Sequence, residues 1–163
     1  MKTLLIVWHS RTGGARQMAE AVRDGAGAES LVLVRLLAAE TAGPDDLLSA
    51  DGIVFAAPEN LAALSGPMKD FFDRSYYPVL GRIEGRPYAT TICAGSDGTN
   101  AVRQIQRIAT GWRLRPIASP IVVCTHAQTP EAILAPKDIA TVDLARCREL
   151  GTAFAAGLDA GIF

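Results

Sequence analysis

The sequence predicts an α/β fold in which a parallel sheet of five strands carries helices on both faces. Strand-like and helix-like segments alternate along most of the chain, as they do when crossover helices connect parallel strands. Several strand candidates are nearly continuous apolar runs, which is typical of strands buried on both faces of a parallel sheet. The segments between them repeat apolar residues at helical spacing. Right-handed crossovers then place helices on both faces.

The first half of the chain supplies three of these strands. Residues 3–8 form an apolar run, and the next segment places an apolar stripe on one helix face: Ala15, Met18, Ala19, Val22 and Ala26. Residues 30–36 predict a second strand, and residues 44–50 a short helical or turn segment. Residues 52–57 predict a third strand, buried on both faces.

The second half continues the alternation. Pro67 suits a first helical turn, and Met68, Phe71 and Phe72 share a face behind it. Residues 87–94 and 120–124 predict the fourth and fifth strands. Two apolar stripes predict the helices that follow them: Val102, Ile105, Ala109 and Trp112, then Cys147, Leu150, Gly151, Phe154 and Leu158. Residues 125–136 predict an irregular connection.

Length and composition limit the classes of protein that this chain can represent. Its 163 residues, 49% apolar and 20% charged, predict one globular domain over residues 1–163. The net charge of −1 excludes a global basic field for nucleic acid. Apolar runs far shorter than about 20 residues predict no membrane insertion, and the start lacks secretory-signal features, so we expect a cytoplasmic protein. Cys93, Cys124 and Cys147 predict reduced packing residues and no metal site.

In such a sheet, ligands bind outside the carboxyl ends of the strands, so the turns after the first, third and fourth strands are the candidate sites. The first turn, residues 9–15, contains Ser10 and Thr12 as hydroxyl donors and Gly13 and Gly14 as points of close approach. Free amides at a helix N-terminus favour a phosphate. Helix capping and a tight turn explain these residues equally well. The turn matches neither nucleotide fingerprint, so a monophosphate fits best.

The run Ser10-Arg11-Thr12-Gly13-Gly14 resembles the phosphate loop of flavodoxins and of flavodoxin-fold NAD(P)H:quinone or FMN reductases, often S/T-x-T-G-N-T. Ala15 stands where that loop often ends in threonine, so it offers only its amide. The resemblance implies a phosphate site formed by Ser10, Arg11, Thr12, Gly13, Gly14 and Ala15.

A second segment, residues 57–74, resembles a stretch of the same reductases that reads P-E-Y-x-x-x-x-S-G-x-M-K-x-x-x-D-R. The resemblance places its first residues beside the isoalloxazine ring: Pro58, Glu59, Asn60 and Leu61. Leu61 stands where many relatives have an aromatic residue. The loop after the fourth strand resembles the one beside the pyrimidine side of the ring: Ala94, Gly95, Ser96, Asp97 and Gly98. An Asp97-Gly98 turn with Thr99 as a helix cap is equally consistent with this loop.

The resemblance implies a flavodoxin-like three-layer α/β/α sandwich with strand order 2-1-3-4-5, and FMN as cofactor. It implies an oxidoreductase that passes hydride from NAD(P)H through FMN to quinones or related acceptors, in a homodimer or tetramer. No catalytic side chain is nominated, because the flavin carries the chemistry. A flavodoxin-like electron carrier and an apo or regulatory protein remain alternatives. We expect His9 and His126 to be solvated.

Overall fold

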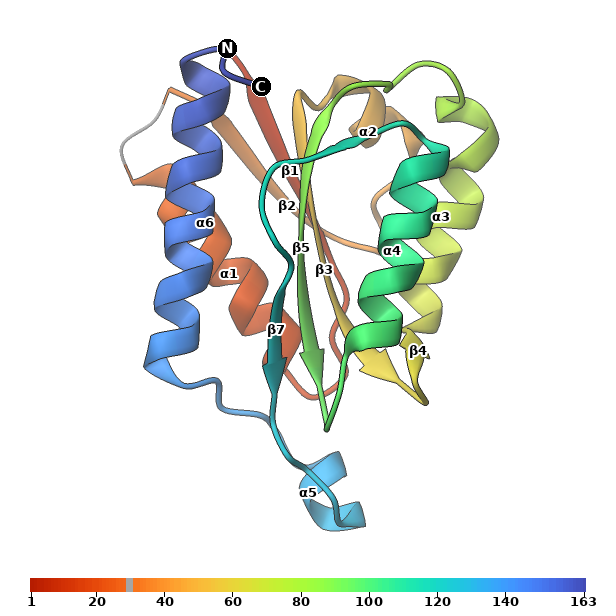
Figure 1. Cartoon of the computed structure of the whole chain (residues 1–163), viewed down its shortest axis with the longest axis vertical. Helices are drawn as coiled ribbons and strands as arrows, with labels where there is room; N and C mark the ends of the chain where they lie inside the picture. Colours follow the sequence, from red (N-terminus) through yellow and green to blue (C-terminus); the bar gives the residue numbers. More distant parts are fainter. Residues whose placement is uncertain (29–30) are drawn as a thin grey trace.

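The structure is a computed structural model that describes residues 1–28 and 31–163 (Figure 1). A central sheet lies between two layers of helices. Helices α1 (Gly14–Gly27) and α6 (Thr141–Asp159) cover one face, and the other face carries α2 (Pro44–Ser49), α3 (Gly66–Val79) and α4 (Thr99–Gly111). The predicted three-layer α/β/α architecture is confirmed.

Five parallel strands form the body of the sheet: β1 (Thr3–Trp8), β2 (Leu33–Ala38), β3 (Gly52–Asn60), β5 (Pro87–Ala94) and β7 (Ile121–Cys124). Their order is β2-β1-β3-β5-β7, which confirms the predicted order 2-1-3-4-5. Two short strands were not predicted. β6 (Arg115–Pro116) pairs with the start of β5 on the edge that β7 occupies further along, and β4 (Ala63–Leu64) pairs antiparallel with the end of β3.

Several predicted boundaries differ from the structure. The second strand, predicted over residues 30–36, runs from Leu33 to Ala38 because it pairs in register with all of β1; residues 29 and 30 lie outside the described part. The third strand continues three residues past its predicted end, where pairing with β4 and β5 replaces the apolar pattern. Helix α5 (Pro130–Leu134) lies within the connection predicted as irregular.

Alternate residues of the central strands point to opposite faces of the sheet and belong to two separate apolar cores. Leu5, Val7 and Phe55 pack toward α3 and α4, and Leu4 and Ile6 pack toward α1 and α6. This alternation explains why the strands read as continuous apolar runs. Within the described residues, none of the helices is long and apolar enough to cross a membrane.

Helices α1 and α6 approach each other closely at two glycines. A Cβ atom added to Gly25 would lie 2.0 Å from the carbonyl oxygen of Arg148, and one added to Gly151 would lie 2.0 Å from the carbonyl oxygen of Val22. Backbone therefore packs on backbone where these helices meet. Any larger side chain must push the helices apart.

Candidate functional site

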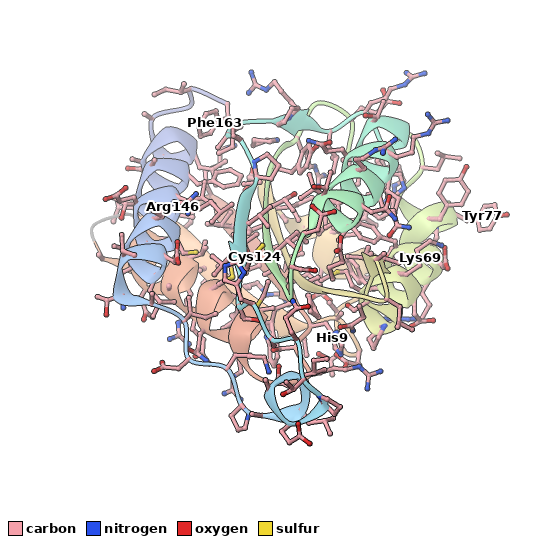
Figure 2. The ribbon with its side chains drawn as sticks, turned by 60° about the horizontal axis from the view of Figure 1, so that its bottom comes forward. His9, Lys69, Tyr77, Cys124, Arg146 and Phe163 are labelled. Atoms are coloured by element: carbon pink, nitrogen blue, oxygen red, sulfur yellow. The ribbon has the colours of Figure 1, made fainter. Side chains whose placement is uncertain are left out.

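A cavity of about 660 Å³ lies at the carboxyl end of the sheet, the end that Figure 2 brings forward. A volume of this size is typical of a cofactor or substrate site. The loops after β1 and β5 and the end of β3 all contribute to its lining. Nine of the fifteen residues predicted for the site line it: Arg11, Thr12, Pro58, Glu59, Asn60, Leu61, Ala94, Gly95 and Ser96.

Eight further residues line the cavity and were not predicted: Ala62, Leu64, Gly66, Cys93, Thr125, Ala127, Ile133 and Lys137. Three of them extend segments that were predicted for the site, and Cys93 lies on β5 beneath the loop. The others come from the connection after β7. Its sequence carries no periodic pattern, so only the position of β7 beside β5 could have drawn attention to it.

The loop after β1 presents a cluster of free backbone donors. The Gly13 amide is used within the loop, where it donates to Ser10 Oγ at 3.0 Å. Six other amides have no hydrogen-bond partner in the described part of the chain: those of Ser10, Arg11, Thr12, Gly14, Ala15 and Arg16. They lie at the N-terminus of α1, the positive end of its dipole. This arrangement fits a phosphate group.

The two glycines of this loop do different work. Gly13 has a left-handed backbone with φ of 92°, which ends the loop before α1 begins. Gly14 is a contact glycine, because a Cβ atom there would lie 2.4 Å from the Sγ of buried Cys93. Its absent side chain lets the first turn of α1 lie directly on β5. Gly14 and Ala15 are buried behind the cavity wall.

The segment that precedes α6 holds the loop in place. The Lys137 amide donates to the Thr12 carbonyl at 2.7 Å. The Gln17 side chain donates to the carbonyls of Gly13 at 3.1 Å and Lys137 at 2.6 Å, and it accepts from the Ile139 amide at 3.1 Å. The end of the loop, at Thr12 and Gly13, is therefore held by contacts with Gln17 and with residues 137–139, about 120 positions away in sequence.

Lys137 also shapes the far wall of the cavity. Its Nζ donates to three carbonyls at the end of α5, those of Ala132, Ile133 and Ala135, at 2.7, 3.0 and 2.6 Å. A cation is favourable at this negative end of a helix. Together with Arg11, Lys137 adds positive charge to the cavity lining, which favours an anionic ligand.

Glu59 fastens the end of β3 to the start of α4. Its carboxylate accepts from the Gly98 amide at 2.9 Å and from the Ala101 amide at 3.0 Å. These amides belong to the first turn of α4, so Glu59, a residue of strand β3, caps the N-terminus of that helix. Two segments predicted for the site are thus joined by one side chain. Gly98 itself has a φ of 85° and packs closely on Val122.

The hairpin of β3 and β4 closes the cavity on one side. Its two-residue loop, Leu61 and Ala62, has φ values of 50° and 56°, as in a type I′ turn, which glycine and asparagine favour. Asn100 donates to the Ala62 carbonyl at 2.6 Å, and the Leu64 amide donates to Gln104 at 2.6 Å. Two residues of α4 therefore anchor a strained turn whose Leu61 side chain is fully exposed.

Replacing the turn with its preferred residues should stabilise the protein. We expect the double variant Leu61→Asn, Ala62→Gly to raise the free energy of unfolding by about 1–2 kcal/mol, because the left-handed strain is removed. Chemical denaturation measures this change. Ile162→Asn is the control, since Ile162 is exposed and its φ is not positive, and its effect should stay within about 0.5 kcal/mol. Equal effects of the two changes would contradict the assignment of strain.

The two histidines differ from each other. His126 is exposed, as expected, and has a φ of 55°. The expectation for His9 was wrong: only 6% of this residue is accessible, and its Nδ1 shares a 2.9 Å hydrogen bond with Ser65 Oγ. A histidine directly after a buried strand gave no sign that a later segment would cover it.

Cys93 and Cys147 are buried, and Cys124 is half buried. Burial raises the pKa of both buried thiols to about 11, so they stay protonated at neutral pH. All three cysteines are free in the structure, in agreement with the prediction.

Native protein treated with iodoacetamide at pH 8 should therefore be alkylated at Cys124 well before Cys93 or Cys147, because the thiolate is the nucleophile, the pKa of each buried thiol is raised, and Cys124 is the more accessible residue. Mass spectrometry of peptides from a time course measures the order, and unfolded protein should lose the difference. Early modification of Cys93 in native protein would contradict the burial and the raised pKa of its thiol.

Comparisons with known proteins agree with this geometry. The family model for NADPH-dependent FMN reductase matches residues 42–129. A flavodoxin of Aquifex aeolicus is 36% identical, over 53% of this chain and 46% of that protein. An NAD(P)H dehydrogenase (quinone) of Acidithiobacillus ferrooxidans is 35% identical, over 46% of this chain and 48% of that protein. The chain spans about half the length of the curated relatives it matches.

Solved structures match nearly the whole chain and show the fold. An archaeal flavodoxin superposes with a TM-score of 0.76 at 20% identity, covering 96% of this chain and 98% of the other. A flavodoxin, WrbA-like protein from Agrobacterium tumefaciens gives a TM-score of 0.70 at 22% identity, covering 96% of both chains. The fold is therefore flavodoxin-like, and because the family model covers more than half of the residues, the chain belongs to the NADPH-dependent FMN reductase family.

Proposed function

We propose that this protein is an FMN-binding oxidoreductase that transfers reducing equivalents from NAD(P)H to quinones or related acceptors. The observation that carries the proposal is the cluster of amides without a partner in the described residues, at residues 10–12 and 14–16. It lies beside a cavity that the two other segments predicted to contact flavin help to line. Family membership and the similarity of this chain to two curated NAD(P)H dehydrogenases (quinone) support the reaction class.

In this proposal the loop amides, with the hydroxyls of Ser10 and Thr12, hold the phosphate of FMN. The segments at residues 58–61 and 94–98 lie beside its ring. FMN supplies hydride and one-electron chemistry when bound, so the chain need only position it and limit access of water. Glu59 and Lys137 line the cavity but bind backbone groups, which suits them to shaping the site.

The second candidate function is a flavodoxin-like electron carrier, and the flavodoxin among the relatives favours it. Carriers of this kind dock through a strongly acidic face, and the net charge of −1 argues against one. The third candidate is an apo or regulatory protein that does not bind flavin strongly. Two residues motivate it: Ala15 has no hydroxyl to offer a phosphate, and Leu61, which is fully exposed, stands where many relatives have an aromatic residue.

One anaerobic titration separates the three candidates. Purified protein receives FMN while its visible absorption is recorded, then NADPH or NADH, and finally a soluble benzoquinone. We expect a perturbed flavin spectrum, rapid bleaching by one pyridine nucleotide, and recovery of colour on addition of the quinone. Bound FMN that neither nucleotide bleaches would favour the carrier, and an unperturbed FMN spectrum would favour the apo protein.

We further propose a homodimer or tetramer in the cytoplasm, following the resemblance. Exposed side chains at the end of α3, those of Tyr76, Tyr77 and Leu80, support self-association, since large apolar groups gathered on a surface often mark an interface. Light scattering coupled to size exclusion measures the assembly, and a mass of 17.2 kDa would contradict it.

A further inference from the structure

A buried polar pair lies behind the cavity wall. His9 follows β1 directly, and its Nδ1 lies 2.9 Å from the Oγ of Ser65, which is fully buried at the N-terminus of α3. Hydrogen bonds between buried side chains this far apart in sequence, 56 positions, restrict the segments that carry them. Figure 2 shows His9 at the end of the molecule that carries the cavity.

The pair connects the two sides of the site. His9 precedes the loop whose Arg11 and Thr12 line the cavity, and Ser65 lies between two lining residues, Leu64 and Gly66. The His9 amide donates to the Ala56 carbonyl at 3.0 Å, which fixes the backbone at this point. His9 therefore holds three segments together at the end of β1: its backbone amide binds β3, and its imidazole binds the start of α3.

The two sides do not depend on this bond equally. The Ser65 side has other anchors: the Leu64 amide donates to Gln104, the Lys69 amide donates to the Ser65 carbonyl, and Leu64 pairs with Glu59 across the hairpin. Ser10 and Arg11, the first residues of the loop after His9, have one such anchor in the described part of the chain, the bond from the Gly13 amide to Ser10 Oγ. The contacts of the loop with Lys137 and Gln17 are made further along, at Thr12 and Gly13. Losing the bond should therefore disturb the phosphate loop more than the hairpin wall.

Burial keeps His9 neutral near pH 7. Burial lowers the pKa of His9, the carboxylate of Glu40 at 3.7 Å from Nε2 opposes this, and the guanidinium of Arg11 adds to it. Another charged residue lies near the segment that carries Glu40. Arg74 of α3 donates to the carbonyls of Ala39 and Ala42, which flank this segment, and it forms an ion pair with Asp70. A neutral ring can take part in the bond to Ser65 as donor or as acceptor.

We propose that His9 is a positioning residue for the phosphate of FMN: its hydrogen bond to Ser65 fixes the start of the amide-bearing loop at residues 10–13. This inference rests on the proposed function. It predicts an effect confined to ligands that carry the phosphate, because the His9–Ser65 bond positions the loop amides that bind the phosphate and not the residues beside the ring. Riboflavin, which is FMN without the phosphate, is the matched ligand.

The test compares dissociation constants of FMN and riboflavin for wild-type protein and for His9→Leu, Ser65→Ala, the double variant and His9→Asn, by quenching of flavin fluorescence. We expect either single change to weaken FMN about tenfold and riboflavin less than twofold, as for one lost hydrogen bond. The double variant should be no weaker than either single variant. Asparagine places an amide near the position of Nδ1, so His9→Asn should stay within about threefold of wild type.

The outcomes are distinguishable. Three results would overturn the positioning role: equal weakening of FMN and riboflavin, additive effects in the double variant, or unchanged FMN binding in the variants. Each of them would leave the proposal that the wild-type protein binds FMN unaffected. If wild-type protein binds neither ligand, the proposed function fails and this inference fails with it. Circular dichroism of each variant checks folding, and Ser65→Ala supplies the comparison if His9→Leu does not fold.

Discussion

Gly25→Ala should lower the free energy of unfolding by about 3 kcal/mol, although alanine is the better helix former. A methyl group at this position meets the Arg148 carbonyl oxygen at 2.0 Å and the Arg148 Cα at 2.9 Å. These are backbone atoms of α6, so no rotamer change relieves the overlap and the two helices must separate. Separation would open the core that α1 and α6 share beneath the phosphate loop. Urea unfolding followed by circular dichroism measures the change.

Gly27→Ala is the matched control, two residues along the same helix. Within residues 1–28 and 31–163, a Cβ atom at Gly27 meets nothing within 4 Å, so alanine there should raise the free energy of unfolding by about 0.5–1 kcal/mol. The same substitution then acts with opposite signs at neighbouring positions. A neutral or stabilising effect of Gly25→Ala would show that α1 and α6 do not pack as closely as described.

Glu59→Ala should cost about 2–3 kcal/mol of stability and weaken FMN binding as well. The substitution leaves the half-buried amides of Gly98 and Ala101 without an acceptor, and bonds to a charged group are among the stronger ones. The loop at residues 95–98 also loses its link to β3, so the wall predicted beside the ring becomes less ordered. Urea unfolding and an FMN titration of the same samples measure both effects.

Glu149→Ala serves as the control for a lost carboxylate, since Glu149 is exposed on α6 far from these amides. Its effect on stability should stay within about 0.5 kcal/mol, with no change in FMN binding. Glu59→Gln should fall between alanine and wild type, because one amide oxygen still accepts a hydrogen bond while the charge is lost. Wild-type stability of Glu59→Ala would contradict the capping role.

The parts of the fold that sequence predicted well are those where local pattern and burial agree. β1 and β5 begin and end where their apolar runs do, and the three loops predicted as sites contribute most of the cavity lining. The short strands β4 and β6 and the helix α5 were not predictable in this way. Each has five residues or fewer, too few to show a periodic pattern. β4 and β6 are defined by pairing with β3 and β5, and α5 by bonds of Thr129 and Lys137 to its backbone.

The roles of individual side chains were harder to predict than their location. Glu59 was predicted beside the ring, yet its carboxylate binds the first turn of α4, because β3 runs past its apolar segment and places Glu59 opposite Gly98. Lys137 was not predicted, since its contact with Thr12 joins residues 125 positions apart. Such long-range pairs leave no local signal in the chain.

The divided edge beside β5 also has a consequence in concentrated solution. Pro116 and Pro120 lack amide hydrogens, and the outer margin of the sheet is broken between β6 and β7. A second molecule that tried to extend the sheet there would find only short runs of hydrogen-bonding groups, interrupted by proline. This margin therefore resists the strand-by-strand growth from which fibrous aggregates form.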